Sequence, residues 1–187
     1  MWAQGASIMW FRKAFRCVHR GQVYTLEKAK PKHIVALMNW FSNLDEAQRW
    51  GGPRLRFPFE RKAFENDIAW RTLPSYVILD AHSQMQAFGQ VFERKQRHHM
   101  GRLVVHNDTR GQALGQLLIE ALLTQAQSKD PRSASSLLVY RDNLPAWHCY
   151  TKLGYTEAEY PKDVPYLEDV AFMVRDLLKH PIRLQQG

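Results

Sequence analysis

The residues from Leu103 to Gly115 combine an apolar strand, a polar turn and the glycine-containing start of a helix. Gly111, Ala113 and Gly115 are small enough to let a ligand approach the backbone closely. The first amides of a helix lack partners within that helix, and together with the helix dipole they attract anions. The segment therefore indicates a site for an anion such as a pyrophosphate. A glycine-containing turn before a core helix would give the same pattern.

A second set of residues whose types and spacing suggest a functional site lies downstream. It comprises Asn143, Ala146, Tyr150, Gly154 and Tyr155. The surrounding pattern predicts a strand, a helix and a further strand. Asn143 can cap the helix, because an asparagine side chain accepts hydrogen bonds from first-turn amides. Gly154 can end it. The phenolic hydroxyl of Tyr150 is thereby placed on the helix between the two strands.

Both segments resemble motifs of the GNAT superfamily of N-acetyltransferases. Arg110 and Gly115 match the ends of the Arg/Gln-x-x-Gly-x-Gly/Ala motif, and Ala113 stands where glycine is usual. The preceding strand also fits, with Asn107 at a position where the family often has proline. The five downstream residues match a second motif in register. The two motifs occur in the family's order and at its separation, and the resemblance covers about residues 22–176.

The resemblance implies an enzyme that transfers an acetyl group from acetyl-coenzyme A to a primary amine by direct attack in a ternary complex. It implies an α/β (α+β) fold with a mixed, strongly twisted central sheet that is splayed in the middle and flanked by helices. Backbone groups of the strand would pair with the pantetheine arm, and amides of the loop would hold the pyrophosphate. The cofactor-binding residues implied in this way are Leu103, Val104, Val105, Arg110, Gly111, Gln112, Ala113, Leu114, Gly115 and Asn143.

Acetyl transfer to an amine needs a neutral amine, a donor for the thioester oxygen and a proton for the leaving thiolate. The resemblance implies that Tyr150 donates this proton, and a phenol with an ordinary pKa of ~10 is protonated at neutral pH. The alternative is a core tyrosine that packs with Trp147 and Leu153. Cys149 lies next to Tyr150, but no local motif supports it as a nucleophile.

The candidate for the base that deprotonates the amine is His99, six residues before Val105 at the beginning of the cofactor strand. A neutral imidazole accepts a proton directly or through water. His98 would point to the opposite face of a regular strand. Three alternatives stay open: a surface histidine in a basic hairpin, Glu93 as the base, or water in that role.

The elements that position these residues follow from periodicity and from turn residues. Strands are expected at residues 22–27, 76–79, 85–93, 102–106, 136–140, 155–160 and 170–176. Helices are expected from Pro31 onward and at residues 45–50, 60–70, 111–127 and 143–153. This order is not an even alternation of strand and helix, so it favours a mixed sandwich. The sheet should splay between the strands 103–105 and 136–140 and leave a cleft for the pantetheine.

The amine acceptor should meet the chain at residues 40–59 and near residues 160–166. Trp50, Phe57 and Phe59 could line an apolar or aromatic pocket there, or they could belong to the core. The acceptor itself is a small molecule or a peptide or protein amine.

The composition limits the other classes of function. The chain has a formal net charge of +8, which attracts anionic partners, but its basic residues form no long run. Nucleic-acid binding is therefore a weaker alternative, and a catalytically silent, regulatory acyl-coenzyme A-binding module is another. Two cysteines without a Cys-x-x-Cys pair indicate neither a metal site nor a disulfide framework, and they suit the cytoplasm.

The organisation expected from the sequence is one acetyltransferase domain over residues 22–187, preceded by a basic N-terminal arm or extension at residues 1–21. No apolar run is long enough to span a membrane. A homodimer is a possible assembly.

Overall fold

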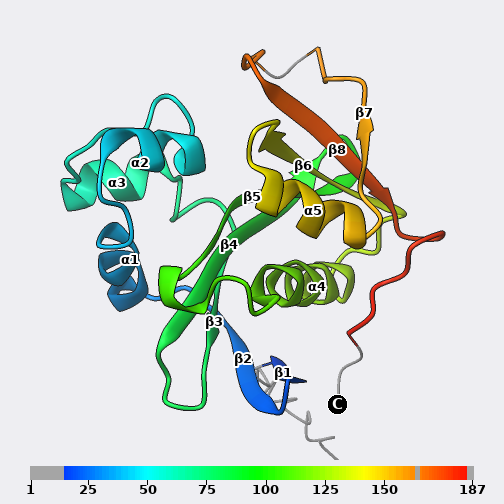
Figure 1. The fold of residues 1–187 in the computed structure, drawn as a ribbon, viewed down its shortest axis with the longest axis horizontal. Coiled ribbons are helices and arrows are strands. Elements are labelled where there is room, and N and C mark those ends of the chain that lie inside the picture. Colours follow the sequence, from blue (N-terminus) through cyan, green and yellow to red (C-terminus); the bar gives the residue numbers. More distant parts are fainter. Residues whose placement is uncertain (1–14, 163–164, 185–187) are drawn as a thin grey trace, which may run out of the picture.

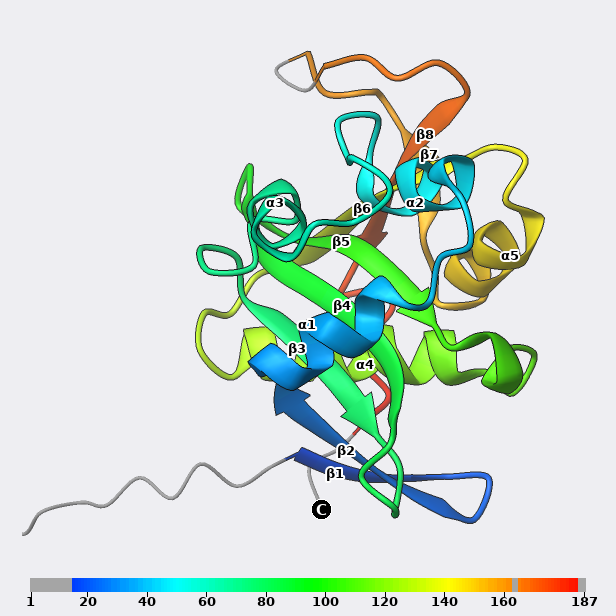
Figure 2. The ribbon, with the colours of Figure 1, turned by 90° about the vertical axis from the view of Figure 1, so that its left-hand side faces the viewer.

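The computed structural model describes residues 15–162 and 165–184. One eight-stranded sheet forms the centre, in the order β1-β2-β3-β4-β5-β6-β8-β7, with helices on both faces (Figures 1 and 2). The strands are β1 (Phe15–His19), β2 (Gln22–Lys28), β3 (Ser75–Leu79), β4 (Met85–Arg94), β5 (Arg97–Val105), β6 (Ala134–Tyr140), β7 (Thr156–Ala158) and β8 (Val170–Asp176). The helices are α1 (Pro31–Met38), α2 (Leu44–Gly51), α3 (Arg61–Asp67), α4 (Leu114–Gln127) and α5 (Leu144–Lys152), with a short 3₁₀ turn at Asn107–Thr109. The expected mixed fold is confirmed.

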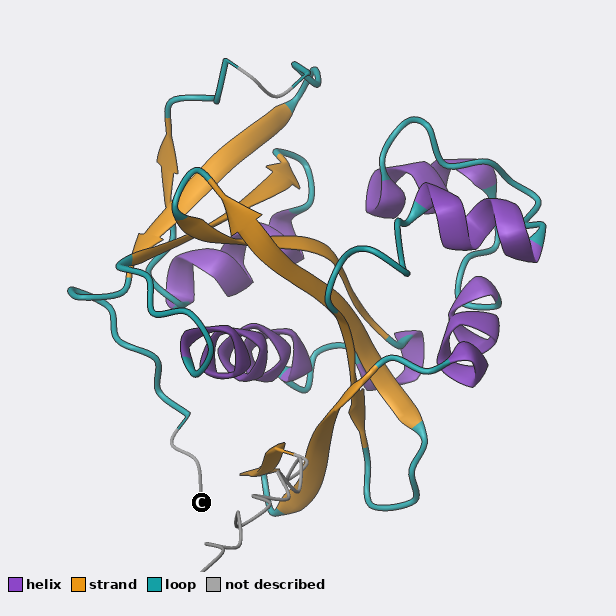
Figure 3. Cartoon of the chain, turned by 180° about the vertical axis from the view of Figure 1, so that it is seen from behind, coloured by secondary structure: helices purple, strands orange, loops and turns teal. Residues whose placement is uncertain are grey.

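Two apolar cores lie on opposite faces of this sheet. Helices α4 and α5 cover one face, where Leu118, Leu122 and Met100 belong to the larger core. Helices α1 to α3 cover the other, where Phe64 and Phe88 belong to the second core. Figure 3 shows the two groups of helices on either side of the strands.

The first strand corrects the expected domain organisation. Phe15–His19 forms β1, which pairs antiparallel with β2, so part of the segment assigned to an N-terminal arm belongs to the sheet. Cys17 of β1 is buried and packs in the larger core, and this burial supports the extra strand. The rest of the expected arm, residues 1–14, lies outside the described residues.

Two further boundaries differ from expectation, and both concern the cofactor segment. Helix α4 begins at Leu114 rather than at Gly111 because Gly111 and Ala113 have positive φ angles of 78° and 62°. Such angles interrupt a right-handed helix. Strand β5 begins at Arg97, earlier than expected, because its two histidines are buried within the sheet.

Candidate active site

The sheet opens between β5 and β6, its only parallel neighbours among the described strands. These strands pair at three positions, from His98 opposite Ser135 to Met100 opposite Leu137, and then separate. A cavity of about 950 Å³ extends along the opening and reaches residues of both strands and of α2, α4 and α5. The predicted splay is therefore confirmed, and the divergence of two parallel strands creates the cleft.

A bulge in β5 divides its side chains between the two faces of the sheet. Arg102 and Leu103 both lie opposite the single residue Gly89 of β4, and Arg102 has a φ of 50°. Leu103 then packs toward Leu122 of α4 so closely that a Cβ on Gly89 would lie 2.9 Å or less from both leucines. Arg102 points to the opposite face, where it donates to the carbonyl of Asp67 at 3.0 Å.

The loop before α4 presents unused amide groups to one end of the cavity. None of the amides from Gly111 to Gly115 donates a hydrogen bond within the part of the chain that the structure describes. The positive φ of Gly111 and Ala113 shapes this loop, and the helix that follows adds its dipole. Free donors beside a cavity at a helix N-terminus are suited to an anion. The expected loop residues line the cavity except Gln112, whose carbonyl oxygen lies 2.8 Å from His19 Nε2.

The contact of His19 brings the β1–β2 hairpin to the same end of the cavity. Arg20, in the turn of that hairpin, lines the cavity together with Arg110 and Lys152. The sequence showed a basic cluster near Arg20, but it gave no sign that this cluster would reach a loop so distant in the chain.

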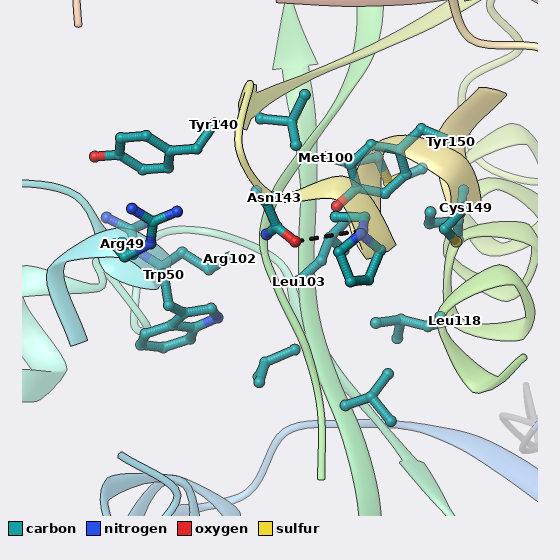
Figure 4. A pocket seen from close by; sticks show the side chains of 18 of the residues that line it. Arg49, Trp50, Met100, Arg102, Leu103, Leu118, Tyr140, Asn143, Cys149 and Tyr150 are labelled. Carbon is teal, nitrogen blue, oxygen red and sulfur yellow. Dashed lines mark hydrogen bonds between the residues drawn. The ribbon is translucent and has the colours of Figure 1, made fainter. Parts of the chain in front are cut away.

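Helix α5 places Asn143 and Tyr150 on the far wall of the cleft (Figure 4). Asn143 caps the helix, since its Oδ1 accepts from the amide of Ala146 at 3.3 Å. Tyr150 is 9% exposed, and burial raises its pKa above that of an ordinary phenol. Within the described residues its hydroxyl makes no hydrogen bond, so this proton stays available to a ligand in the cavity. Burial also raises the pKa of the neighbouring Cys149 thiol to about 11, which disfavours a thiolate nucleophile.

His99 lines the cavity from β5 but is only 3% exposed. Its Nδ1 lies 3.0 Å from Ser136 Oγ, and its Nε2 lies 3.4 Å from Arg94 Nη1. A guanidinium only donates, so Nε2 is the accepting nitrogen and Nδ1 carries the hydrogen of the neutral ring. Burial, followed by the positive charge of Arg94, lowers the pKa of His99 to about 3.

This neutral state should make the folded protein sensitive to acid. The pKa of His99 falls from 6.5 to about 3 on folding, so between these values the unfolded chain binds more protons and acid favours unfolding. From pH 7 to pH 5 this side chain should lower the free energy of unfolding by about 2 kcal/mol. Urea unfolding at both pH values measures the loss, which should be smaller by this amount in His99→Asn. Equal losses in the two proteins would contradict the assignment.

The aromatic residues expected around the acceptor separate into two groups. Trp50 lines the cavity. Phe57 and Phe59 do not line it: their rings contact each other at 5.1 Å, and Phe59 lies 4.6 Å from Phe64 in the second core. The prediction that Phe57 and Phe59 line a pocket is thus corrected, because α3 draws both rings into the core beneath it.

Three basic side chains of the cavity were not predicted from the sequence, namely Arg49, Arg94 and Arg102. Arg102 could have been recognised as a candidate site residue, because it is a charged residue that interrupts an otherwise apolar stretch of the strand. Arg49 and Arg94 come from separate elements, and only the fold brings them together.

The splayed mixed sheet, the free amides before α4 and the tyrosine of α5 define an acyl-coenzyme A-dependent transferase class. The sequence profile of the acetyltransferase (GNAT) family matches residues 38–155, which is more than half of the chain, and the chain belongs to this family. It is an N-acetyltransferase that uses acetyl-coenzyme A as co-substrate. The match supports neither the silent binding module nor the nucleic-acid-binding protein.

Solved structures share this fold. One is a spermidine N-acetyltransferase from Vibrio cholerae in complex with CoA and spermine, with a TM-score of 0.65 and 16% identity over 84% of this chain and 97% of that chain. Mutant forms of a spermidine/spermine N-acetyltransferase from the same organism give a TM-score of 0.64 and 17% identity over 84% and 95% of the two chains. At such identities the likeness concerns the fold.

Two further features are absent from the part of the chain that the structure describes. Within residues 15–162 and 165–184, no group of three or more His, Cys, Asp or Glu side chains could hold a metal ion. No helix in the same ranges is long and apolar enough to cross a membrane.

Proposed function

We propose that acetyl-coenzyme A binds in the cleft between β5 and β6, with its pyrophosphate on the amides from Gly111 to Gly115, next to Arg110, whose own amide donates to the carbonyl of Asn107. The observation that carries this placement is the row of unused amides at one end of a cavity that continues between the strands. The backbone of Leu103–Val105 is the proposed partner of the pantetheine arm, and Asn143 contributes from α5. The basic residues Arg20 and Lys152 at this end of the cavity suit the phosphate groups of the same molecule.

For the chemical step we propose that a neutral amine attacks the thioester carbon from the side of α1 to α3. The C–N bond forms and the C–S bond breaks, and Tyr150 donates its proton to the departing sulfur. The availability of this hydroxyl in the cavity supports the assignment. Its raised pKa keeps the phenol protonated over the pH range in which amines lose their proton.

The proton of the amine needs a separate acceptor. His99 lines the cavity, but a pKa of about 3 makes it a weak base. Glu93 is exposed, accepts from the amide of Gln96 and does not line the cavity. The geometry therefore favours water over both side chains, with His99 in a secondary role as a neutral relay.

The test is binding followed by turnover. Calorimetric titration should show binding of acetyl-coenzyme A to one site, and release of free thiol should then be measured over a panel of amines that includes spermidine. Binding with thiol release dependent on one amine supports the proposal. Binding without release for any amine would favour the silent module, and salt-dependent binding to DNA with no affinity for acetyl-coenzyme A would favour the nucleic-acid alternative.

Three broader features are proposed from the sequence. The domain is proposed to continue to residue 187, with its N-terminal boundary moved ahead of β1 because β1 pairs within the sheet. A cytoplasmic location is supported by the two unpaired cysteines, Cys17 and Cys149. Homodimer assembly is proposed on the sequence alone, and light scattering measures it.

A further inference from the structure

The half of the cavity on the side of α1 to α3 is rich in positive charge. Arg49 of α2, Arg94 of β4 and Arg102 of β5 line it, and Glu46 is the one carboxylate residue among the described lining residues. Glu46 is exposed and accepts from the amide of Ser42 at 2.9 Å. In Figure 4, Arg49, Trp50 and Arg102 lie on the opposite side of the strands from Tyr150, Cys149 and Leu118. The positive charge therefore faces the side from which the amine is proposed to enter.

Arg94 has no carboxylate partner within the described residues. Its guanidinium lies 5.8 Å from the centre of the Phe92 ring, and its nearest polar contact is His99 at 3.4 Å. Neither the aromatic ring nor the neutral imidazole carries a negative charge that could pair with this cation. The cation can therefore attract an anion in the cavity.

Arg102 also forms no salt bridge within the described residues, although the negative charge of Asp67 lies close enough to act on it. It donates to Gln90 Oε1 at 2.8 Å and to a backbone carbonyl at 3.0 Å, while its Nε is buried and makes no hydrogen bond. Asp67, the nearby carboxylate, is bound to Arg56 at 2.6 Å. A buried charged donor without an acceptor is costly, and an anion beside this guanidinium would offset part of the cost through its charge.

Two neighbouring groups complete this half of the cavity. The indole Nε1 of Trp50 is a second buried donor without a hydrogen-bond partner. Arg49 is partly neutralised, since it pairs with Asp142 at 2.5 Å and lies over the Tyr140 ring at 4.9 Å. Donors outnumber acceptors on this wall, which is the opposite of what a polycationic amine needs.

We propose that the acetyl acceptor is a small amine that carries an oxyanion, a carboxylate or a phosphate, which Arg94 and Arg102 bind while the amine faces the thioester. This inference rests on the proposed function. It adds the substrate class, and it predicts that polyamines, which carry no anion, are poor acceptors.

Matched acceptor pairs test the proposal. A set of natural L-amino acids is compared with their carboxamides, and O-phosphoethanolamine with ethanolamine, by thiol release at saturating acetyl-coenzyme A; spermidine is the polycationic reference. We expect the best acceptor to bear an oxyanion and to exceed its neutral partner at least about tenfold in kcat/KM. Amidation lowers the pKa of the amine and supplies more neutral nucleophile, so a preference for the acid cannot come from amine reactivity. A preference within the amino-acid pairs indicates a carboxylate, and a preference for O-phosphoethanolamine over ethanolamine indicates a phosphate.

Charge-neutral variants locate the effect. Arg94→Gln should raise KM for the anionic acceptor by about tenfold, with little change in KM for its neutral partner or for acetyl-coenzyme A. Arg102→Gln should do the same, and Arg94→Gln keeps the test decisive if the buried variant fails to fold. Lys62→Gln on α3 removes the same charge from an exposed position outside the cavity and should leave the preference unchanged.

The outcomes separate this inference from the proposed function. Acetylation that is equal within each pair, or fastest with spermidine, would overturn the inference and leave the acetyltransferase assignment intact. Absence of thiol release with every amine would instead count against the proposed function. The inference is then tested by the melting temperature of the protein in the presence of coenzyme A. At least one anionic amine should raise this temperature more than its neutral counterpart does. Equal shifts within every pair would overturn the inference.

Discussion

Replacement of Tyr150 by phenylalanine should lower kcat by roughly 10²-fold, at the low end of the range for general acid catalysis. The ring and its packing survive, while the proton for the departing thiolate is lost. The hydroxyl has no hydrogen-bond partner within the described residues, so the fold should lose little stability. Binding of acetyl-coenzyme A, followed by calorimetry, should change little. Steady-state thiol release with the best amine of the panel measures the effect.

Tyr155 provides a matched control for this prediction. Its ring lies 6.1 Å from that of Tyr150, it is buried in the same core, and its hydroxyl shares a hydrogen bond of 2.7 Å with Ser135. Tyr155→Phe should therefore cost about 1 kcal/mol of unfolding free energy and leave kcat near the parent value. If Tyr150→Phe keeps full turnover, Tyr150 is a packing residue rather than the acid.

The pH dependence of turnover gives a second readout of Tyr150. Because burial raises its pKa, the phenol stays protonated above pH 10, and the rate should rise with pH as the amine becomes neutral, without an early alkaline decline. A decline that sets in near neutral pH would indicate a different proton donor.

The second large effect is expected for Gly115→Glu, which should weaken binding of coenzyme A at least about 10²-fold. The new carboxylate repels the pyrophosphate, and each ~1.4 kcal/mol of repulsion lowers the affinity tenfold. A Cβ at this position would lie 3.5 Å from Cys149 Sγ and 4.0 Å from Val105 Cγ2, which are ordinary contacts. A carboxylate in the first turn also favours the helix dipole, so the fold should persist. Isothermal titration with coenzyme A measures the loss, and circular dichroism checks the fold.

Two further variants separate bulk from charge. Gly115→Gln has the same size as the glutamate but no charge, and it should bind coenzyme A more tightly than Gly115→Glu. Gly115→Ala should stay close to the parent. A folded Gly115→Glu protein with parental affinity would show that the pyrophosphate does not bind at this loop.

Most of the fold could be predicted because its signals are local. Glycines and prolines mark the turns, and the spacing of apolar residues from Leu114 to Leu122 reports the buried face of α4. Strand β5 was predicted too short because His98 and His99 look exposed in sequence. In the structure, Gln127 and Ser136 from other elements supply their hydrogen bonds, and this allows both imidazoles to be buried.

Residues of the site could be predicted only where they lie together in one continuous segment of the sequence. The loop before α4 and the tyrosine of α5 lie within continuous motifs, so their positions along the chain were sufficient to find them. The arginines of the acceptor side come from α2, β4 and β5, and their convergence depends on the packing of α2 against β5. The rings of Phe57 and Phe59 were misplaced for the same reason, since composition does not reveal which side of a loop meets the core.

The parting of β5 and β6 leaves two edge strands inside a molecule whose sheet is otherwise continuous. Backbone donors and acceptors along these inner edges resemble those that promote aggregation at outer edges, but the surrounding helices prevent another chain from reaching them. In the proposed complex the pantetheine arm occupies this gap as an additional, non-peptide strand. The amide protons of β5 beyond Met100 that face β6 rather than β4 would then exchange quickly with solvent in the free enzyme and slowly in the complex, so the ligand would complete the secondary structure of the protein that binds it.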